Sequence, residues 1–227
     1  QHGVIMPLAK DLTTFTTASP VVATFNYTDI ADGTGKIVFQ LFTAANSTPT
    51  TSYLVSENPI GSANVGYSIS GSSSADTTTD TLNFDASPFN LVRTVRGNVK
   101  VRFSHYSHIS SSGSGWDCSH HLKCSLYRLS GAVETLIGEE TSPTIQRTSG
   151  AGYSAANRVL EFDATETLFA VGDILRIKII SYHVFGNGFN GANGFACDPD
   201  NKDWGSNITA ADNPTYFKVE IPFKIDQ

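Results

Sequence analysis

Residues 160–183, LEFDATETLFAVGDILRIKIISYH, decide the fold class. They comprise a short strand, a polar turn ending at Gly172-Asp173, and a long strand whose side chains alternate in character. One set is Leu175, Ile177 and Ile179, and the other is Arg176, Lys178 and Ile180. A period of two turns one set towards a core and the other towards solvent or a neighbour. The stretch predicts an antiparallel sandwich and carries no catalytic group.

The rest of the chain follows the same pattern. Alternating segments predict about nine or ten strands and no helix, with turn residues at the spacing that sandwiches and barrels show. We therefore expect an all-β fold, an antiparallel two-sheet sandwich of the jelly-roll type with long loops. We expect residues 21–227 to form this single domain. We expect residues 1–20, which contain Pro7 and Pro20, to form an extended N-terminal arm.

The composition narrows the class of protein. Charged residues make up 16% of the 227 residues, below the roughly 25% of soluble domains, and hydrophobic residues make up 40%. Such neutral, polar, β-rich chains are common among secreted and virion proteins. A formal net charge of −6 argues against a nucleic-acid-binding surface. The absence of a run of about 18 apolar residues predicts no membrane span.

Residues 185–214 predict a long loop, and such loops are usually functional or mobile. The loop contains an oxygen-rich run of Asp198, Asp200, Asn201 and Asp203. Carboxylate and amide oxygens are ligands of Ca²⁺, so the run is a candidate calcium site. It lacks the glycine and the closing glutamate of an EF-hand loop, and a solvated acidic turn is the simpler interpretation.

Large aromatic side chains in the loops need burial, either on the sandwich end or on a partner. The candidate anchors for a partner are Trp116, Phe185, Phe189, Phe195 and Trp204. A sugar-stacking platform is the alternative, and its members would be Tyr53, Tyr67, Tyr106, Trp116 and Trp204.

The three cysteines are Cys118, Cys124 and Cys197. An odd count leaves at least one thiol outside any internal disulfide, and the sequence leaves open whether the other two form a bridge. Cys118 and Cys124 could bridge at a hairpin end, and either could instead bond Cys197.

Five histidines suggest a zinc site with these cysteines: His105, His108, His120, His121 and His183. Within each close pair, however, the two side chains face opposite sides of a strand, whereas zinc needs convergent ligands. His183 could meet His105 or His108 where their strands pair. Scattered histidines at the surface or core edge are the simpler interpretation.

Catalytic motifs are missing from the sequence. It has no G-x-S-x-G elbow, no H-E-x-x-H helix and no phosphate-binding loop. It also identifies no pair of glutamates of the kind that glycosidases use. We therefore expect a protein that is not an enzyme.

The segment quoted first resembles the closing strands of jelly-roll virion structural proteins from tailed phages and environmental double-stranded DNA viruses. Those proteins carry a D-x-T-x-x-x-F-x-x-G-D-x-L-R pattern before the last core strand. The matching residues here are Asp163, Thr165, Phe169, Gly172, Asp173, Leu175 and Arg176. Residues 25–44, FNYTDIADGTGKIVFQLFTA, resemble the opening strands. The resemblance covers under half of the chain, brings no active site, and implies a capsid, decoration or turret-type protein.

The leading hypothesis is a virion structural protein that self-assembles into homo-oligomers in or on a capsid, beside other virion or envelope proteins. The second is a secreted or cell-surface module that binds glycans, with Ca²⁺ at the acidic run. The third is a subunit of a cell envelope or filament. Deleting residues 1–20 distinguishes them, because an assembly that depends on the arm falls apart whereas a glycan module binds unchanged.

Overall fold

The computed structural model describes residues 34–45, 52–57, 66–71, 76–109, 118–147, 151–185, 191–197 and 216–224. These residues form twelve strands and contain no helix, which confirms the all-β class. Within these ranges no helix has the length and apolar character needed to cross a membrane.

The strands range from short edge pieces to long curved elements that run the length of the molecule. They are β1 (Thr34–Ala45), β2 (Tyr53–Ser56), β3 (Gly66–Gly71), β4 (Asp76–Asp85), β5 (Arg93–Ile109), β6 (Cys118–Ser130), β7 (Val133–Thr141), β8 (Ile145–Arg147), β9 (Gly152–Phe169), β10 (Ile174–Phe185), β11 (Gly191–Ala196) and β12 (Phe217–Lys224).

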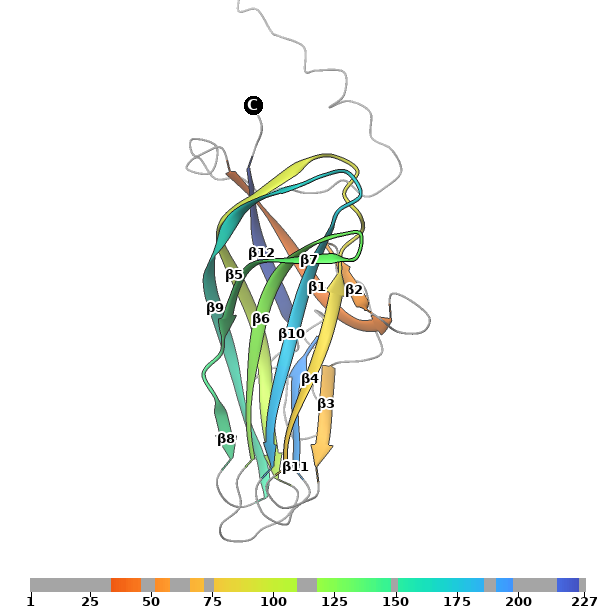
Figure 1. Ribbon diagram of the computed structural model, residues 1–227. Helices are drawn as coiled ribbons and strands as arrows, with labels where there is room; N and C mark the ends of the chain where they lie inside the picture. Colours follow the sequence, from red (N-terminus) through yellow and green to blue (C-terminus); the bar gives the residue numbers. More distant parts are fainter. Residues whose placement is uncertain are drawn as a thin grey trace, which may run out of the picture.

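Eight of these strands form two four-stranded layers in jelly-roll order. One layer runs β1–β12–β5–β9 and the other runs β4–β10–β6–β7, with every neighbouring pair antiparallel. Among these eight strands the chain crosses between layers after β1, β4, β5, β7, β9 and β10, as two interleaved Greek keys require. Figure 1 shows β4, β10 and β6 side by side in front of β5 and β12. The jelly-roll prediction is confirmed.

The remaining strands join and extend the two layers. β2 pairs with β1 and, in parallel, with β4, so all twelve strands belong to one continuous hydrogen-bonded sheet. β11 pairs with β3 and with the second half of β5, and β8 pairs with β6.

The long loop expected at residues 185–214 needs correction. It contains β11, whose residues from Gly191 to Phe195 pair with β5 from Ile109 back to His105. The sequence pattern does not predict this strand, because two of its six residues are glycines, which have no side chain to show the alternation of a strand.

Inward-facing side chains follow the predicted period of two. In β10 every second residue from Leu175 to Phe185 is buried, which confirms the alternation expected for Leu175, Ile177 and Ile179. Burying one such side chain stabilises the fold by about 1.5–3 kcal/mol. The interior is not apolar along its whole length, however, and its polar part is the starting point for the site.

Candidate functional site

A band of polar side chains crosses the interior at one end of the sandwich. On β5, β6 and β10 it separates the main apolar core from a small apolar cluster of Ile109, Cys118 and Phe185. We call this band the histidine layer. Its members are His105, Ser107, His120, Ser181, His183 and Asn193, all with no exposed surface.

Both layers of the sandwich contribute histidines. His105 comes from β5, whereas His120 and His183 face each other directly across β6 and β10. The ring centroids of His105 and His120 lie 5.4 Å apart. Those of His120 and His183 lie 4.9 Å apart, with the two planes at 17°. The three imidazoles therefore form one cluster: His120 and His183 stack within one layer, and His105 meets His120 from the other layer with the ring planes tilted by 44°.

Most polar atoms of the histidine layer lack a hydrogen-bond partner in the protein. His120 Nε2 lies 2.8 Å from Ser181 Oγ. Both ring nitrogens of His105 and His183 have no such partner, and neither does Nδ1 of His120. The side-chain amide of Asn193 donates to the carbonyl of Ser119 at 3.0 Å. Buried polar groups are normally paired, so this layer lowers the stability of the fold.

Burial keeps the three imidazoles neutral at neutral pH. Desolvation, helped by the nearby Arg158 guanidinium, lowers the pKa of His105 to about 3. Desolvation also lowers the pKa of His183 to about 4, although the Asp80 carboxylate raises it in part. For His120, burial and the two neighbouring histidines hold the pKa well below its usual value.

The other two histidines of the proposed zinc set lie outside this layer. His108 stacks on Tyr153 with ring centroids 4.0 Å apart, and His121 stacks on Tyr182 at 4.6 Å. Within the described ranges, no group of three or more His, Cys, Asp or Glu side chains is arranged to hold a metal ion. The zinc interpretation gains no support there.

Two of the predicted partner anchors are instead part of the interior. Phe185 and Phe195 are 1% and 0% exposed, and Phe195 packs edge-on against Phe217 with centroids 5.7 Å apart. This corrects the prediction, and the reason is that β10 extends to Phe185 and β11 carries Phe195 inward. The predictions for Trp116, Phe189, Asp198, Asp200, Asn201, Asp203, Trp204 and the arm at residues 1–20 concern positions outside the described residues and stay predictions.

All three cysteines are buried, and none of them forms a disulfide in the structure. Cys118 belongs to the small cluster, and Cys124 and Cys197 belong to the main core. Cys118 and Cys124 are six residues apart on the extended strand β6, about 20 Å at 3.3 Å per residue. A disulfide needs Cα atoms within about 7 Å, so the bridge considered between these two is excluded. Burial raises the pKa of the Cys124 thiol.

The members of the sugar platform whose side chains are described pack against separate neighbours. Tyr53 lies against Phe84 of the core at 5.5 Å between centroids, and Tyr106 lies against Tyr153 at 5.7 Å. Neither contact forms an open stacking surface shared by both tyrosines.

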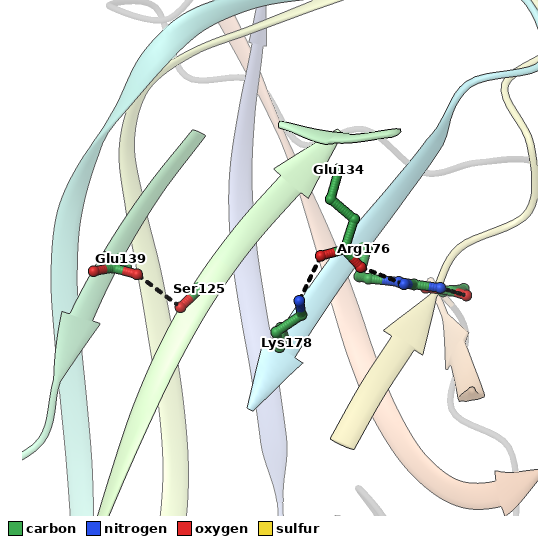
Figure 2. A network of polar contacts seen from close by, with 6 residues as sticks. Ser125, Glu134, Glu139, Arg176 and Lys178 are labelled. Carbon is green, nitrogen blue, oxygen red and sulfur yellow. Dashed lines mark hydrogen bonds and ion pairs between the residues drawn. The ribbon is translucent and has the colours of Figure 1, made fainter. Parts of the chain in front are cut away.

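A network of charged side chains ties together the outer face of the β4–β10–β6–β7 layer. Arg176 on β10 binds both carboxylate oxygens of Asp85 on β4, at 2.6 and 2.7 Å, and reaches Glu134 on β7 at 2.5 Å. Lys178 joins Glu134 at 2.5 Å and lies 4.4 Å above the ring of Tyr127. Figure 2 shows Glu134 between Arg176 and Lys178. The hydrogen bond from Lys178, helped by Arg176, lowers the pKa of Glu134. The network stabilises the layer.

Exposed apolar side chains gather at the end of the sandwich opposite the histidine layer. We call them the apolar rim, and its members are Leu91, Val92, Val133, Leu168 and Val171, each 51–65% exposed. They lie on or beside the β4–β5, β6–β7 and β9–β10 connections, which share the upper end of Figure 1. Backbone bonds between Phe89 and the 172–173 turn, at 2.8 and 2.9 Å, join two of these connections.

A pocket of about 370 Å³ lies beside β1, β2 and residues 86–93. Phe39, Val55 and Phe89 form apolar parts of its wall, and Glu57 and Arg93 are its charged groups. Burial raises the pKa of Glu57, and Arg93 partly opposes this. The described lining contains one carboxylate, so it lacks the carboxylate pair of glycoside hydrolysis.

Comparison with known proteins gives fold likeness only. No family model and no curated protein matches the sequence. A CocE/NonD family hydrolase from Staphylococcus aureus is similar at TM-score 0.40 and 9% identity, over 84% of this chain and 37% of that one. A chain from infectious bursal disease virus, Gx strain, is similar at TM-score 0.31 and 13% identity, over 83% of this chain and 38% of that one. TmCBM61, solved with β-1,4-galactotriose, is similar at TM-score 0.24 and 14% identity, over 72% of this chain and 84% of that one.

The presence of hydrolases among these structures corrects one expectation. We expected a protein that is not an enzyme, and this is contradicted because an alpha-amino acid ester hydrolase is also similar, at TM-score 0.40 and 9% identity over 75% of this chain and 34% of that one. This chain spans about a third of the length of these hydrolases. At such TM-scores, no reaction, substrate or catalytic residue is transferred to it.

Proposed function

We propose that this chain is a jelly-roll subunit that assembles with copies of itself, in or on a virion. The observation that carries the proposal is the apolar rim. Large apolar side chains exposed together are unusual on a monomer and mark contact surfaces. Here they occupy one end of a sandwich whose strand order is that of the jelly roll.

Hydrogen bonds hold the backbone around part of the apolar rim. Asp173 accepts a hydrogen bond from the backbone nitrogen of Ala170 at 2.8 Å, which closes the β9–β10 turn. Arg128 donates to the carbonyl of Leu168 at 2.9 Å and ties the end of β6 to that turn. A surface that is already ordered loses little conformational freedom on association, so more of the apolar contact energy is available for binding.

Charged groups lie close to these side chains, as at the edge of a protein interface. Arg96 and Glu166 are both more than half exposed and lie 3.8 Å apart, on β5, which begins directly after Val92, and on β9, which contains Leu168. An apolar centre with a polar surround is the usual anatomy of such a contact. The proposed occupant of the rim is a second copy of this chain.

The native mass of the full chain, measured by light scattering, tests this proposal. We expect a defined oligomer that Val171→Asp dissociates, because association would bury the carboxylate without a partner. Val159→Asp is the matched control, since Val159 is 54% exposed on the outer side of β9 and away from the rim. A monomeric parent chain, or equal dissociation by both variants, would overturn the proposal.

A second arm of the same measurement tests the calcium prediction. If Asp198, Asp200, Asn201 and Asp203 hold Ca²⁺ that orders a contact between copies, chelation with EDTA lowers the native mass and added Ca²⁺ restores it. A mass that EDTA leaves unchanged removes calcium from the assembly model and leaves the role of the apolar rim as it stands.

A further inference from the structure

The histidine layer connects the two sheets of the sandwich by unusual means. His105 belongs to the β1–β12–β5–β9 layer, and His120 and His183 belong to the β4–β10–β6–β7 layer. Where these rings meet, the contact between the sheets is the pair His105–His120, whose ring planes are tilted by 44° at 5.4 Å between centroids, and His183 stacks on His120 within its own sheet. The contact therefore depends on the charge state of the rings.

We propose that the histidine layer is a proton-sensitive latch, which holds the two sheets together at this end when its imidazoles are neutral and opens when they are protonated. Two positive rings at stacking distance in a dry interior repel each other, and each loses its hydration. The apolar core at the other end, among the described residues, consists mainly of aliphatic and aromatic side chains, so it keeps the sheets joined while the latch opens.

The charged groups near the histidine layer do not neutralise three protonated imidazoles, so protonation favours opening of the latch. On β4, Asp80 Oδ2 lies 3.9 Å from His183 Nε2 and stabilises one imidazolium. On β9, Arg158 disfavours a charge on His105, and on β6 His121 disfavours one on all three rings. β11 adds the uncharged side chains of Asn193 and Phe195. One carboxylate among the described neighbours therefore faces three imidazoles.

The direction of the pH effect follows from linkage. Above about pH 6.5 the rings are neutral in both the folded and the unfolded chain, and the layer adds no pH dependence. Below it the unfolded chain binds protons that the folded chain excludes, until the folded values of about 4 for His183 and about 3 for His105 are reached. Stability is therefore present at neutral pH and is lost as the pH falls from about 6.5 towards 4.

Urea unfolding of the full chain at constant ionic strength, from pH 7.5 to 4.5, measures the effect. For His105 and His183 together, the unfolding equilibrium constant rises about 100-fold per pH unit below 6, or tenfold for each histidine. His183→Leu removes about a tenfold factor from that slope. The matched control is His108→Gln, on the same strand as His105 but outside the layer, which leaves the slope nearly unchanged.

Hydrogen exchange on the parent chain tests where the opening occurs and needs no variant. After correction for intrinsic rates, the amides of residues 118–122 and 181–185 lose protection at pH 5 while those of 124–129 and 175–179 keep it. Uniform loss of protection, or a slope that His183→Leu and His108→Gln leave equally steep, would overturn the proposal. The urea curves are recorded at one protein concentration, so that any association through the apolar rim affects the parent chain and both variants alike.

Discussion

On β10 the inward side chains are Leu175, Ile177 and Ile179 in one half of the strand, and Ser181 and His183 in the other. β5 and β6 make the same change at the same level, from valine, phenylalanine and leucine to histidine. One half of the interior therefore gains about 1.5–3 kcal/mol for each buried aliphatic side chain. The other half contains buried polar atoms that each cost about 1–3 kcal/mol when unpaired. The comparison shows that burial of apolar side chains at one end of the sandwich stabilises the fold, whereas unpaired polar atoms at the other end destabilise it.

The largest effect is expected from truncating the apolar half where it meets the histidine layer. Phe103 is fully buried and stacks on Phe217 with ring centroids 5.2 Å apart. Phe103→Ala removes this packing and leaves a cavity, so the free energy of unfolding falls by about 3–5 kcal/mol. Urea denaturation at pH 7.5 measures it, and a loss below about 1 kcal/mol would mean that this half does not supply the stability.

Polar groups that have partners should behave differently from the histidine layer. Arg176→Ala leaves Asp85, a nearly buried carboxylate, without its bidentate partner, and we expect a loss of about 3 kcal/mol. Arg176→Lys is the matched variant, because it keeps the positive charge but loses the paired hydrogen bonds. Its free energy of unfolding should lie between those of the parent chain and of Arg176→Ala. Equal stabilities for all three chains in urea would show that the network contributes nothing.

Packing of the small cluster beyond the histidine layer gives a smaller effect. A Cβ at Gly191 would lie 2.5 Å from Cys118 Sγ and 3.1 Å from the carbonyl oxygen of His108. Gly191→Ala should therefore lower the free energy of unfolding by about 1–3 kcal/mol through overpacking. Cys118→Ala in the same chain removes the closest contact and should restore part of the loss. Additive effects of the two changes in thermal unfolding would place the strain elsewhere.

The smallest effect concerns the hydrogen bond between His120 and Ser181. Ser181→Ala removes the 2.8 Å partner of His120 Nε2 and leaves another buried nitrogen unpaired, at a loss of about 1–2 kcal/mol. Ser125→Ala is the control, because its 3.2 Å bond is made to Glu139, a partly exposed carboxylate that also pairs with Lys123, and it should change stability by less. A larger loss for Ser125→Ala would reverse this order.

The histidine layer shows how far sequence reasoning reached. The alternation that identified Leu175, Ile177 and Ile179 continues through Ser181 and His183, and the alternation through Val99, Val101 and Phe103 continues to His105. The alternation alone therefore places His183 and His105 on the inward side of their strands. The interpretation of scattered histidines at the surface or core edge is wrong for His105, His120 and His183, and that they meet depends on the partner strand of each, which the sequence does not show. The apolar rim was missed for a similar reason, since Leu91, Val133 and Val171 lie in three connections far apart in the sequence.

The sequence by itself determined the all-β class and the inward set of side chains, because these depend on the local period of two along each strand. It also determined the positions of the main turns, where glycine and aspartate permit the backbone geometry. Only the tertiary structure decided that β11 lies beside β5, that His105 meets His120 and His183, and that Phe185 and Phe195 are interior. These facts depend on strand order and register, which pair residues as far apart as Thr34 and Lys224 and leave no local trace in the chain.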